Sequence, residues 1–311
     1  MYTNHGRGKR SGHARTIRIG ALTLAITMLA AMTWSPRSAD PVDVEFQTPA
    51  ESAMYYEADD VYLITNFGTG GPAAIDDDGF ISRVDAETGE VVELEWITGT
   101  LSAPKGMAIV GSTLYVADMD AVEMYDLEND GAPLGDVKID TSQITFPNDV
   151  CAGEDGVVYL TDSGMNADFS PSGTDAVYRL DEGQLVLVAG GADTLKGPNG
   201  CLVDDGGLLV VNGSNEVLRV GDDGDVSQVT TMPNGGLDGI VEHDGDYYVT
   251  SWEAGSVFRF DMEGGEIVTV AADTPSPADL GFDTKRNRLI IPLLQFGEGP
   301  PFHVVSRDLN E

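Results

Sequence analysis

Phe146-Pro-Asn-Asp149 is followed by the turn Gly153-Glu-Asp-Gly156 and then by the run Val157-Val-Tyr-Leu-Thr161. β-Branched and aromatic residues favour strands, and the acidic, glycine-containing turn before them favours a hairpin. The same order of features recurs along the chain, while the periodicity of helices is absent. The strand-like runs lie at residues 61–65, 113–117, 157–161, 208–211, 247–250 and 288–292.

A short signature precedes each unit of this repeat. The six signatures are Pro49-Ala-Glu51, Pro104-Lys-Gly106, Pro147-Asn-Asp149, Pro198-Asn-Gly200, Leu237-Asp-Gly239 and Pro277-Ala-Asp279. A unit of about 40–50 residues with four short strands is typical of a β-propeller blade. We therefore expect an all-β, six-bladed propeller as a single domain over residues 40–311. We also expect residues 42–46 to pair into the last blade, which would close the ring and remove its open edges.

The charge of the chain excludes several classes of partner. It carries 17 basic and 52 acidic side chains, for a formal net charge of −35. Nucleic-acid affinity depends on basic side chains that neutralise phosphates, and anionic membrane surfaces would be repelled for the same reason. With 41% hydrophobic residues, the chain can nevertheless bury a substantial core. We therefore expect no nucleic-acid partner and no membrane partner beyond the N-terminal segment.

That N-terminal segment has the composition of an export signal. Residues 1–39 contain basic side chains and no acidic one, and they include an apolar stretch at 19–34. The stretch is shorter than the ~20 apolar residues of a membrane span. We expect residues 1–39 to direct export to the periplasm or the cell exterior, and they are either cleaved or kept as an N-terminal anchor.

The signatures also predict a site. In a propeller, the loop that enters the first strand of each blade opens onto the central channel. In register, the signatures place Glu51, Lys105, Asn148, Asn199, Asp238 and either Ala278 or Asp279 around that channel. Carboxylate and carboxamide oxygens suit a hard cation, and Ca²⁺ accepts six to eight of them in flexible geometry. We expect a divalent cation there, with Ca²⁺ the favoured ion.

Four of these segments resemble a known family in their order along the chain. They are Pro49-Ala-Glu-Ser52, Phe146-Pro-Asn-Asp149, Gly197-Pro-Asn-Gly200 and Gly236-Leu-Asp-Gly239. They are similar to segments of the senescence-marker-protein and gluconolactonase family, which is related to diisopropylfluorophosphatase. The resemblance covers roughly residues 46–308.

The resemblance implies a calcium-dependent hydrolase of lactones or related esters. It assigns Glu51, Asn199 and Asp238 as metal ligands and Asn148 as a fourth ligand or a substrate contact. Asp238 would also be the catalytic carboxylate, which either attacks the substrate or activates a water, while the cation polarises the carbonyl or phosphoryl oxygen. The alternative is an exported propeller without catalytic activity that serves as a binding scaffold and has a structural ring.

Lys105 and Asp279 have two interpretations each. The Lys105 ammonium either pairs with Glu51 or Asp279 in place of a metal, or it binds the developing oxyanion of the substrate. Asp279 either contacts the substrate or supports the ring from behind.

The two cysteines and the tryptophans carry structural expectations. Cys151 lies three residues after Asn148, whereas Cys201 lies two residues after Asn199. Because these offsets point to opposite faces of a strand, we expect two separate buried thiols and no disulfide. Trp96 and Trp252 are expected in the core, with a place at the mouth of the channel as the alternative for Trp252, which directly follows the strand at residues 247–251.

Overall fold

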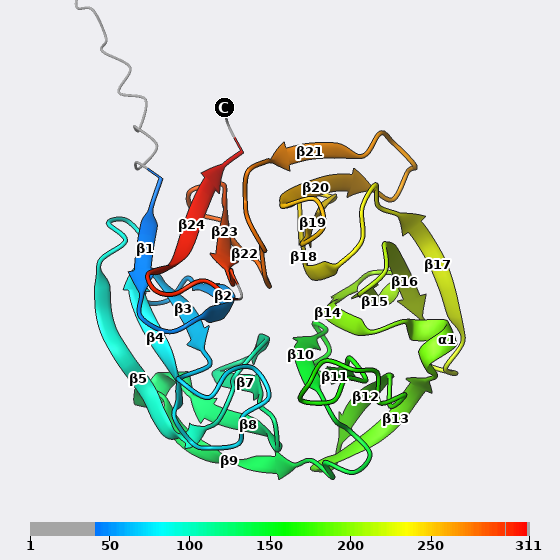
Figure 1. Ribbon diagram of the computed structural model, residues 1–311, viewed down its shortest axis with the longest axis horizontal. Coiled ribbons are helices and arrows are strands. Elements are labelled where there is room, and N and C mark those ends of the chain that lie inside the picture. Colours follow the sequence, from blue (N-terminus) through cyan, green and yellow to red (C-terminus); the bar gives the residue numbers. More distant parts are fainter. Residues whose placement is uncertain (1–40, 296, 310–311) are drawn as a thin grey trace, which may run out of the picture. The chain divides into compact units, whose positions relative to one another are not determined.

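The computed structural model of the protein describes residues 41–295 and 297–309. Within these residues, six antiparallel sheets of four strands each stand around a central channel (Figure 1). The fold is a six-bladed β-propeller, as the sequence predicts. The predicted leader at residues 1–39 lies outside the described residues.

Each of the first five blades is a meander of consecutive strands. Blade one is β2 (Ala50–Tyr56), β3 (Val61–Asn66), β4 (Gly79–Asp85) and β5 (Val91–Leu101). Blade two is β6 (Met107–Val110), β7 (Thr113–Ala117), β8 (Ala121–Asp126) and β9 (Ala132–Lys138). Blade three is β10 (Pro147–Ala152), β11 (Val158–Asp162), β12 (Ala176–Asp181) and β13 (Gln184–Gly190). Blade four is β14 (Pro198–Asp204), β15 (Gly207–Asn212), β16 (Glu216–Val220) and β17 (Val226–Thr231). Blade five is β18 (Leu237–His243), β19 (Asp246–Ser251), β20 (Ser256–Asp261) and β21 (Val268–Ala271).

Blade six combines both ends of the described chain. Its strands are β22 (Gly281–Asp283), β23 (Arg288–Leu293), β24 (Phe302–Asp308) and β1 (Asp43–Phe46). β1 pairs antiparallel with β24, with Val44 opposite Val304 and Phe46 opposite Phe302. The even-numbered residues of β1 are buried and the odd-numbered ones are exposed. The backbone of β1 therefore covers the edge of β24, while its apolar face packs against blade one. The predicted closure by residues 42–46 is therefore confirmed.

The helical content of the described residues is very low. It consists of the one-turn helix α1 (Ala192–Leu195) and the 3₁₀ turn η1 (Leu127–Asn129). Among the residues with described structure, no helix has the length and apolarity needed to cross a membrane.

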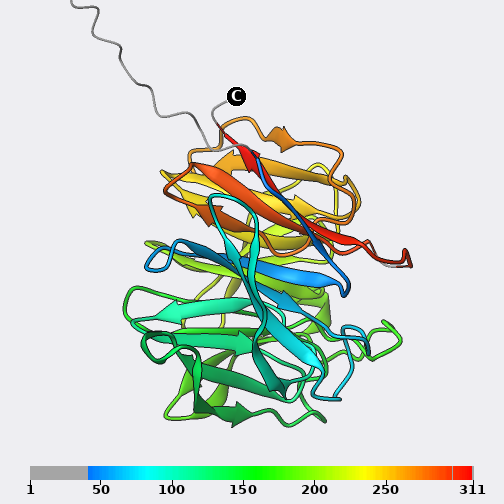
Figure 2. The same cartoon turned by 90° about the vertical axis from the view of Figure 1, so that its left-hand side faces the viewer.

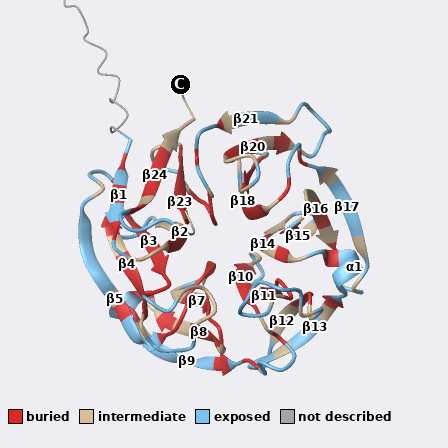
Figure 3. Ribbon diagram, viewed as in Figure 1, coloured by how far each residue is buried: buried red, intermediate tan, exposed pale blue. Residues whose placement is uncertain are grey.

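The core lies between neighbouring blades. The inner and middle strands are largely buried, while the outermost strands β5, β9, β13 and β17 expose much of their length (Figure 3). One apolar cluster joins Leu160 of blade three to Ala108 and Val122 of blade two, and equivalent clusters fill the other interfaces. Each blade therefore depends on both neighbours for its stability.

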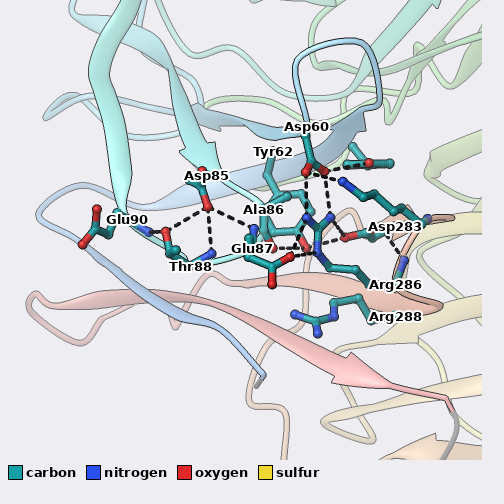
Figure 4. A network of polar contacts seen from close by, with 12 residues as sticks. Asp60, Tyr62, Asp85, Ala86, Glu87, Thr88, Glu90, Asp283, Arg286 and Arg288 are labelled. Carbon is teal, nitrogen blue, oxygen red and sulfur yellow. Dashed lines mark hydrogen bonds and ion pairs between the residues drawn. The ribbon is translucent and has the colours of Figure 1, made fainter. Parts of the chain in front are cut away.

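A buried arginine ties blade six to blade one. Arg286, in the β22–β23 turn, donates to Asp60 Oδ1 (2.8 Å) in the β2–β3 turn and to Asp283 Oδ2 (3.0 Å) (Figure 4). It also donates to Glu87 Oε2 (3.1 Å), and Tyr62 donates its hydroxyl to Asp283 (2.7 Å). The hydrogen bonds that Asp60 accepts, led by those from Arg286 and followed by those from Lys285 and Tyr55, hold its pKa well below the usual range. The network reinforces the joint that β1 closes.

The cysteine expectation was wrong. Cys151 of β10 and Cys201 of β14 form a disulfide across the interface of blades three and four, with their Cα atoms 5.6 Å apart. Each blade packs one side of its sheet against the preceding blade and the other side against the following blade. At every interface, the forward side of one blade therefore contacts the backward side of the next. Residues on opposite strand faces are therefore the ones that meet, and both cysteines belong to one interblade apolar cluster.

Candidate active site

The signatures lie on β-bulges at the starts of four inner strands. β2, β10, β14 and β18 each shift register there, so that two residues oppose one on the neighbouring strand. In β2, Glu51 and Ser52 together oppose Thr65. A bulge re-aims a side chain that regular pairing would direct into the sheet. In these four blades the repeat thus turns one polar side chain toward the channel.

Three of these bulges each leave one backbone amide unpaired, and in each case a threonine on the second strand of the blade accepts a hydrogen bond from it. The hydroxyl of Thr65 accepts a hydrogen bond from Ser52 N (2.9 Å), Thr161 accepts one from Asp149 N (3.0 Å), and Thr250 accepts one from Gly239 N (2.8 Å). An unpaired buried amide would cost free energy, so these threonines stabilise the bulges. They hold the backbone of Glu51, Asn148 and Asp238 in place.

Five of the predicted ring residues line one cavity of about 480 Å³: Glu51, Lys105, Asn148, Asn199 and Asp238. They come from five successive blades. Neighbouring inner strands are joined directly at this level, for example by the hydrogen bond from Gly106 N to Asn148 O (3.0 Å).

Blade six departs from the pattern. Pro277 bridges to Leu293, as Pro147 pairs with Asp162 in blade three, so the ring position of blade six is Ala278. Asp279 bridges instead to Ser52 and accepts a hydrogen bond from its hydroxyl. It lines a separate cavity of about 250 Å³ together with Asp149. Of the two residues that the sequence left open, Ala278 occupies the ring.

Glu51 and Asp238 are buried carboxylates with incomplete hydrogen bonding. In the part of the chain that the structure describes, Glu51 Oε2 and Asp238 Oδ1 are buried and have no hydrogen-bond partner. Burial, and then repulsion from Asp238 and Asp279, raises the pKa of Glu51 well above its usual value. Burial and the charge of Asp279 raise the pKa of Asp238 to about 8, against the effect of hydrogen bonds from Trp252 and Asn199. The positive charge of Lys105 offsets only part of the rise for Glu51, and no positive charge contributes to the shift of Asp238.

The two carboxamides are positioned by their neighbours. The amide nitrogen of Asn148 donates to Ser163 Oγ (2.8 Å), and Ser163 in turn donates to Pro198 O (2.7 Å) of the next blade. With its nitrogen engaged, Asn148 has its carbonyl oxygen available for the cavity. Asn199 is hydrogen-bonded to Asp238. Both side chains can therefore add neutral oxygen ligands to the two carboxylates.

Lys105 is 1% exposed and is held by weak contacts. Its ammonium donates to Ala103 O (3.2 Å) and to Met119 Sδ (3.1 Å), and it lies 4.8 Å from the ring centroid of Phe146. Among the described residues, no carboxylate forms a direct ion pair with it, although Glu51 and Asp118 exert an attractive charge effect. Burial lowers the pKa of Lys105 to about 8. The expected pairing with Glu51 or Asp279 is thus not found as a direct contact.

The part of the cavity wall outside the polar ring is apolar, a feature that the sequence analysis missed. It is formed by Phe67, Pro72, Phe146, Met165, Phe169, Leu237, Trp252 and Leu294. Most of these residues come from connections between the second and third strands of the blades, which the strand pattern does not place. The loops at residues 67–78 (light blue) and 164–175 (green) project from the same side of the propeller (Figure 2). Trp252 lines this wall, which was the alternative to the core position expected for it.

The donor set fits a hard cation better than a soft one. No group of three or more His, Cys, Asp or Glu side chains in residues 41–295 and 297–309 is arranged to hold a metal. Beside the ammonium of Lys105, the ring offers two carboxylates and two carboxamides, all oxygen ligands, and one oxygen of each carboxylate has no hydrogen-bond partner within the described residues. Two carboxylates and neutral oxygen ligands suit Ca²⁺, and water molecules can complete its coordination shell.

Solved structures share this fold. A gluconolactonase from Xanthomonas campestris, XC5397, has a TM-score of 0.64 at 20% identity, over 86% of this chain and 90% of that one. A structural-genomics target described as a candidate gluconolactonase has a TM-score of 0.62 at 15% identity, over 88% and 95%. A chain of the nidogen/laminin complex has a TM-score of 0.55 at 19% identity, over 71% and 79%. These identities establish a shared fold alone.

The sequence itself is more informative. No curated protein matches it. The model of the SMP-30/gluconolactonase/LRE-like region matches residues 69–292, which is more than half of the chain and spans most of the propeller. Membership of that family indicates a lactonase-type hydrolase that acts on a small molecule. The chain therefore belongs to the SMP-30/gluconolactonase/LRE-like family.

Proposed function

We propose that the protein is an exported, metal-dependent hydrolase of lactones or related esters, with its active site in the 480 Å³ cavity. The observation that carries the proposal is the pair of buried carboxylate oxygens, on Glu51 and Asp238, that have no hydrogen-bond partner within the described residues. A buried anion of this kind costs several kcal/mol unless it is paired, and a cation between the two would remove that cost.

The residues divide into three roles. Glu51, Asn148, Asn199 and Asp238 would hold the cation, and the cation when bound would polarise the carbonyl oxygen of the substrate. Asp238 would also accept the proton of the attacking water. Lys105 would donate a hydrogen bond to the oxyanion that develops on the carbonyl oxygen.

The overall reaction is the addition of water across an ester bond. The water oxygen bonds to the carbonyl carbon while its proton passes to Asp238. The bond from that carbon to the ring oxygen then breaks, and the leaving alkoxide takes the proton from Asp238. A hydroxy acid is released and the carboxylate is restored. In the variant of this mechanism in which Asp238 attacks the carbonyl itself, water hydrolyses the resulting acyl-enzyme.

The scaffold alternative rests on the fold rather than on the site. The nidogen/laminin complex shows that a similar fold occurs in a protein–protein complex. A binding scaffold, however, has no need of buried carboxylates without partners in its channel. The ring therefore favours the hydrolase.

The test is a hydrolysis assay with lactones and phosphoesters on chelator-treated protein, before and after the addition of Ca²⁺. We expect turnover only after the addition, and its loss in Asp238→Asn. The matched control is Asp205→Asn, which changes an exposed hairpin aspartate outside the cavity. The absence of turnover on every ester, or equal turnover with and without metal, would refute the proposal.

A further inference from the structure

The cavity is divided into two chemically different halves. Its floor carries the polar ring residues, including Glu51 and Asp238. Its walls are aromatic and aliphatic, and they are built mainly by Phe67, Phe146, Met165, Phe169 and Trp252. A polyhydroxylated sugar lactone would need hydrogen-bond partners for each hydroxyl group, because a buried hydroxyl without a partner is unfavourable. The walls offer almost none.

We propose that the substrate is a lactone or ester that carries a sizeable alkyl or aryl group, rather than a polyhydroxylated sugar lactone. The inference rests on the proposed function and specifies its substrate class. The reacting carbonyl would lie at the polar floor, and the apolar group would lie between the aromatic walls. The volume of about 480 Å³ lies within the 300–1,000 Å³ range of small-molecule sites.

Phe169 is the wall residue that depends least on the core. It is 52% exposed and its ring centroid lies 6.1 Å from that of Phe146. Its backbone has φ of +62°, a conformation that a bulky residue rarely adopts. An exposed aromatic ring on a strained backbone at the mouth of a cavity is unfavourable for folding alone. We assign it to contact with the apolar group of the substrate.

The experiment compares kcat/KM for three lactones of equal ring size: δ-valerolactone, δ-decalactone and glucono-δ-lactone. Burial of a methylene gains about fourfold in binding, so the pentyl chain of δ-decalactone should raise kcat/KM at least roughly tenfold over δ-valerolactone. Glucono-δ-lactone should be the poorest of the three. A preference for glucono-δ-lactone would overturn the inference and leave the hydrolase proposal intact.

A variant tests the assignment of Phe169. Phe169→Asn removes the ring while keeping a residue that tolerates positive φ, so the loop can keep its backbone. We expect the ratio of kcat/KM for δ-decalactone to kcat/KM for δ-valerolactone to lose most of its wild-type excess. The control is Leu187→Thr, which removes an equally exposed apolar side chain from β13, outside the cavity. An unchanged chain-length preference in Phe169→Asn would overturn the assignment.

Binding separates failure of this inference from failure of the proposed function. If no lactone is hydrolysed, the hydrolase proposal falls, and the apolar site is then judged with 2-heptylcyclopentanone and 2-methylcyclopentanone, which have no ester to cleave. Their binding can be followed by the fluorescence of Trp252, which lines the cavity. At least roughly tenfold tighter binding of the heptyl compound would support an apolar ligand. Equal binding, or none, would overturn the inference.

Discussion

Glu51 of blade one and Asp238 of blade five line the same cavity, and each keeps a buried carboxylate oxygen without a hydrogen-bond partner in the described part of the chain. The charge of Asp238 also raises the pKa of Glu51, so the two groups repel each other across the cavity. A fold retains such a pair at a cost in stability. We infer that a cation offsets this cost, and the predictions below follow from the site and from its scaffold.

Replacing Lys105 by methionine separates binding of metal from catalysis. We expect Lys105→Met to lower kcat by about 10²–10³, the usual cost of losing one donor to an oxyanion. Ca²⁺ affinity should stay the same or rise, because the variant removes a positive charge near Glu51. The measurement is kcat on the preferred lactone together with a calcium titration. Lys138→Met, at a lysine whose side chain is 61% exposed, is the control. Unchanged turnover would rule out the oxyanion role.

The disulfide should contribute to stability. Cys151 and Cys201 close a loop with a sequence separation of 50 residues, for which chain entropy predicts about 4 kcal/mol. We expect reductant to lower the Tm of the wild type, and the double variant Cys151→Ala/Cys201→Ala to have a low Tm with or without reductant. Calorimetric scans of both proteins check this. If reductant left the wild-type Tm unchanged while mass spectrometry confirmed free thiols, the bond would have no stabilising effect.

Glu123 should make stability depend on pH. This β8 residue is 6% exposed, and burial, reinforced by Asp136, raises its pKa to about 7 from 4.5. A carboxyl group with a raised pKa in the folded state contributes stability that is complete below pH 4.5 and is lost as the pH rises through about 7.

The variant Glu123→Gln removes this titration. We expect it to raise Tm by a few °C at pH 8 and to have little effect at pH 4.5. Glu128→Gln, at an exposed residue of η1, should change Tm at neither pH. A loss of stability in Glu123→Gln at pH 8 would show that its carboxylate is compensated in the folded protein.

The fold could be predicted from the sequence because one repeat specifies both strand order and register. The signature of each unit marks the entry to an inner strand, and residues 43–46 had no other strand to pair with than the last one. The ring followed from the same register, since a bulge at four of the six signatures directs a polar residue inward. Blade six was ambiguous because aligning Pro277 with Pro49 would place Asp279 at the ring position of Glu51. In the structure Pro277 instead occupies the pairing position of Ala50, which moves the ring position to Ala278.

The disulfide and the apolar wall of the cavity could not be predicted, because both depend on how different blades and loops contact one another. The disulfide follows from the way in which one blade faces the next, which the alternation of faces within one strand does not reveal. The apolar wall depends on loops that fold over the channel, such as the one carrying Phe169. Two signals were visible: Phe146 directly precedes the Pro-Asn-Asp signature of blade three, and Trp252 directly follows a strand of blade five.

The central claim is that a cation binds the ring, and calorimetric titration of Ca²⁺ into chelator-treated protein tests it most directly. We expect the wild type and Asp205→Asn to bind an ion with equal affinity, and Glu51→Gln and Asp238→Asn to lose that binding. No heat of binding in the wild type, or the same binding in Asp238→Asn as in the wild type, would contradict the account.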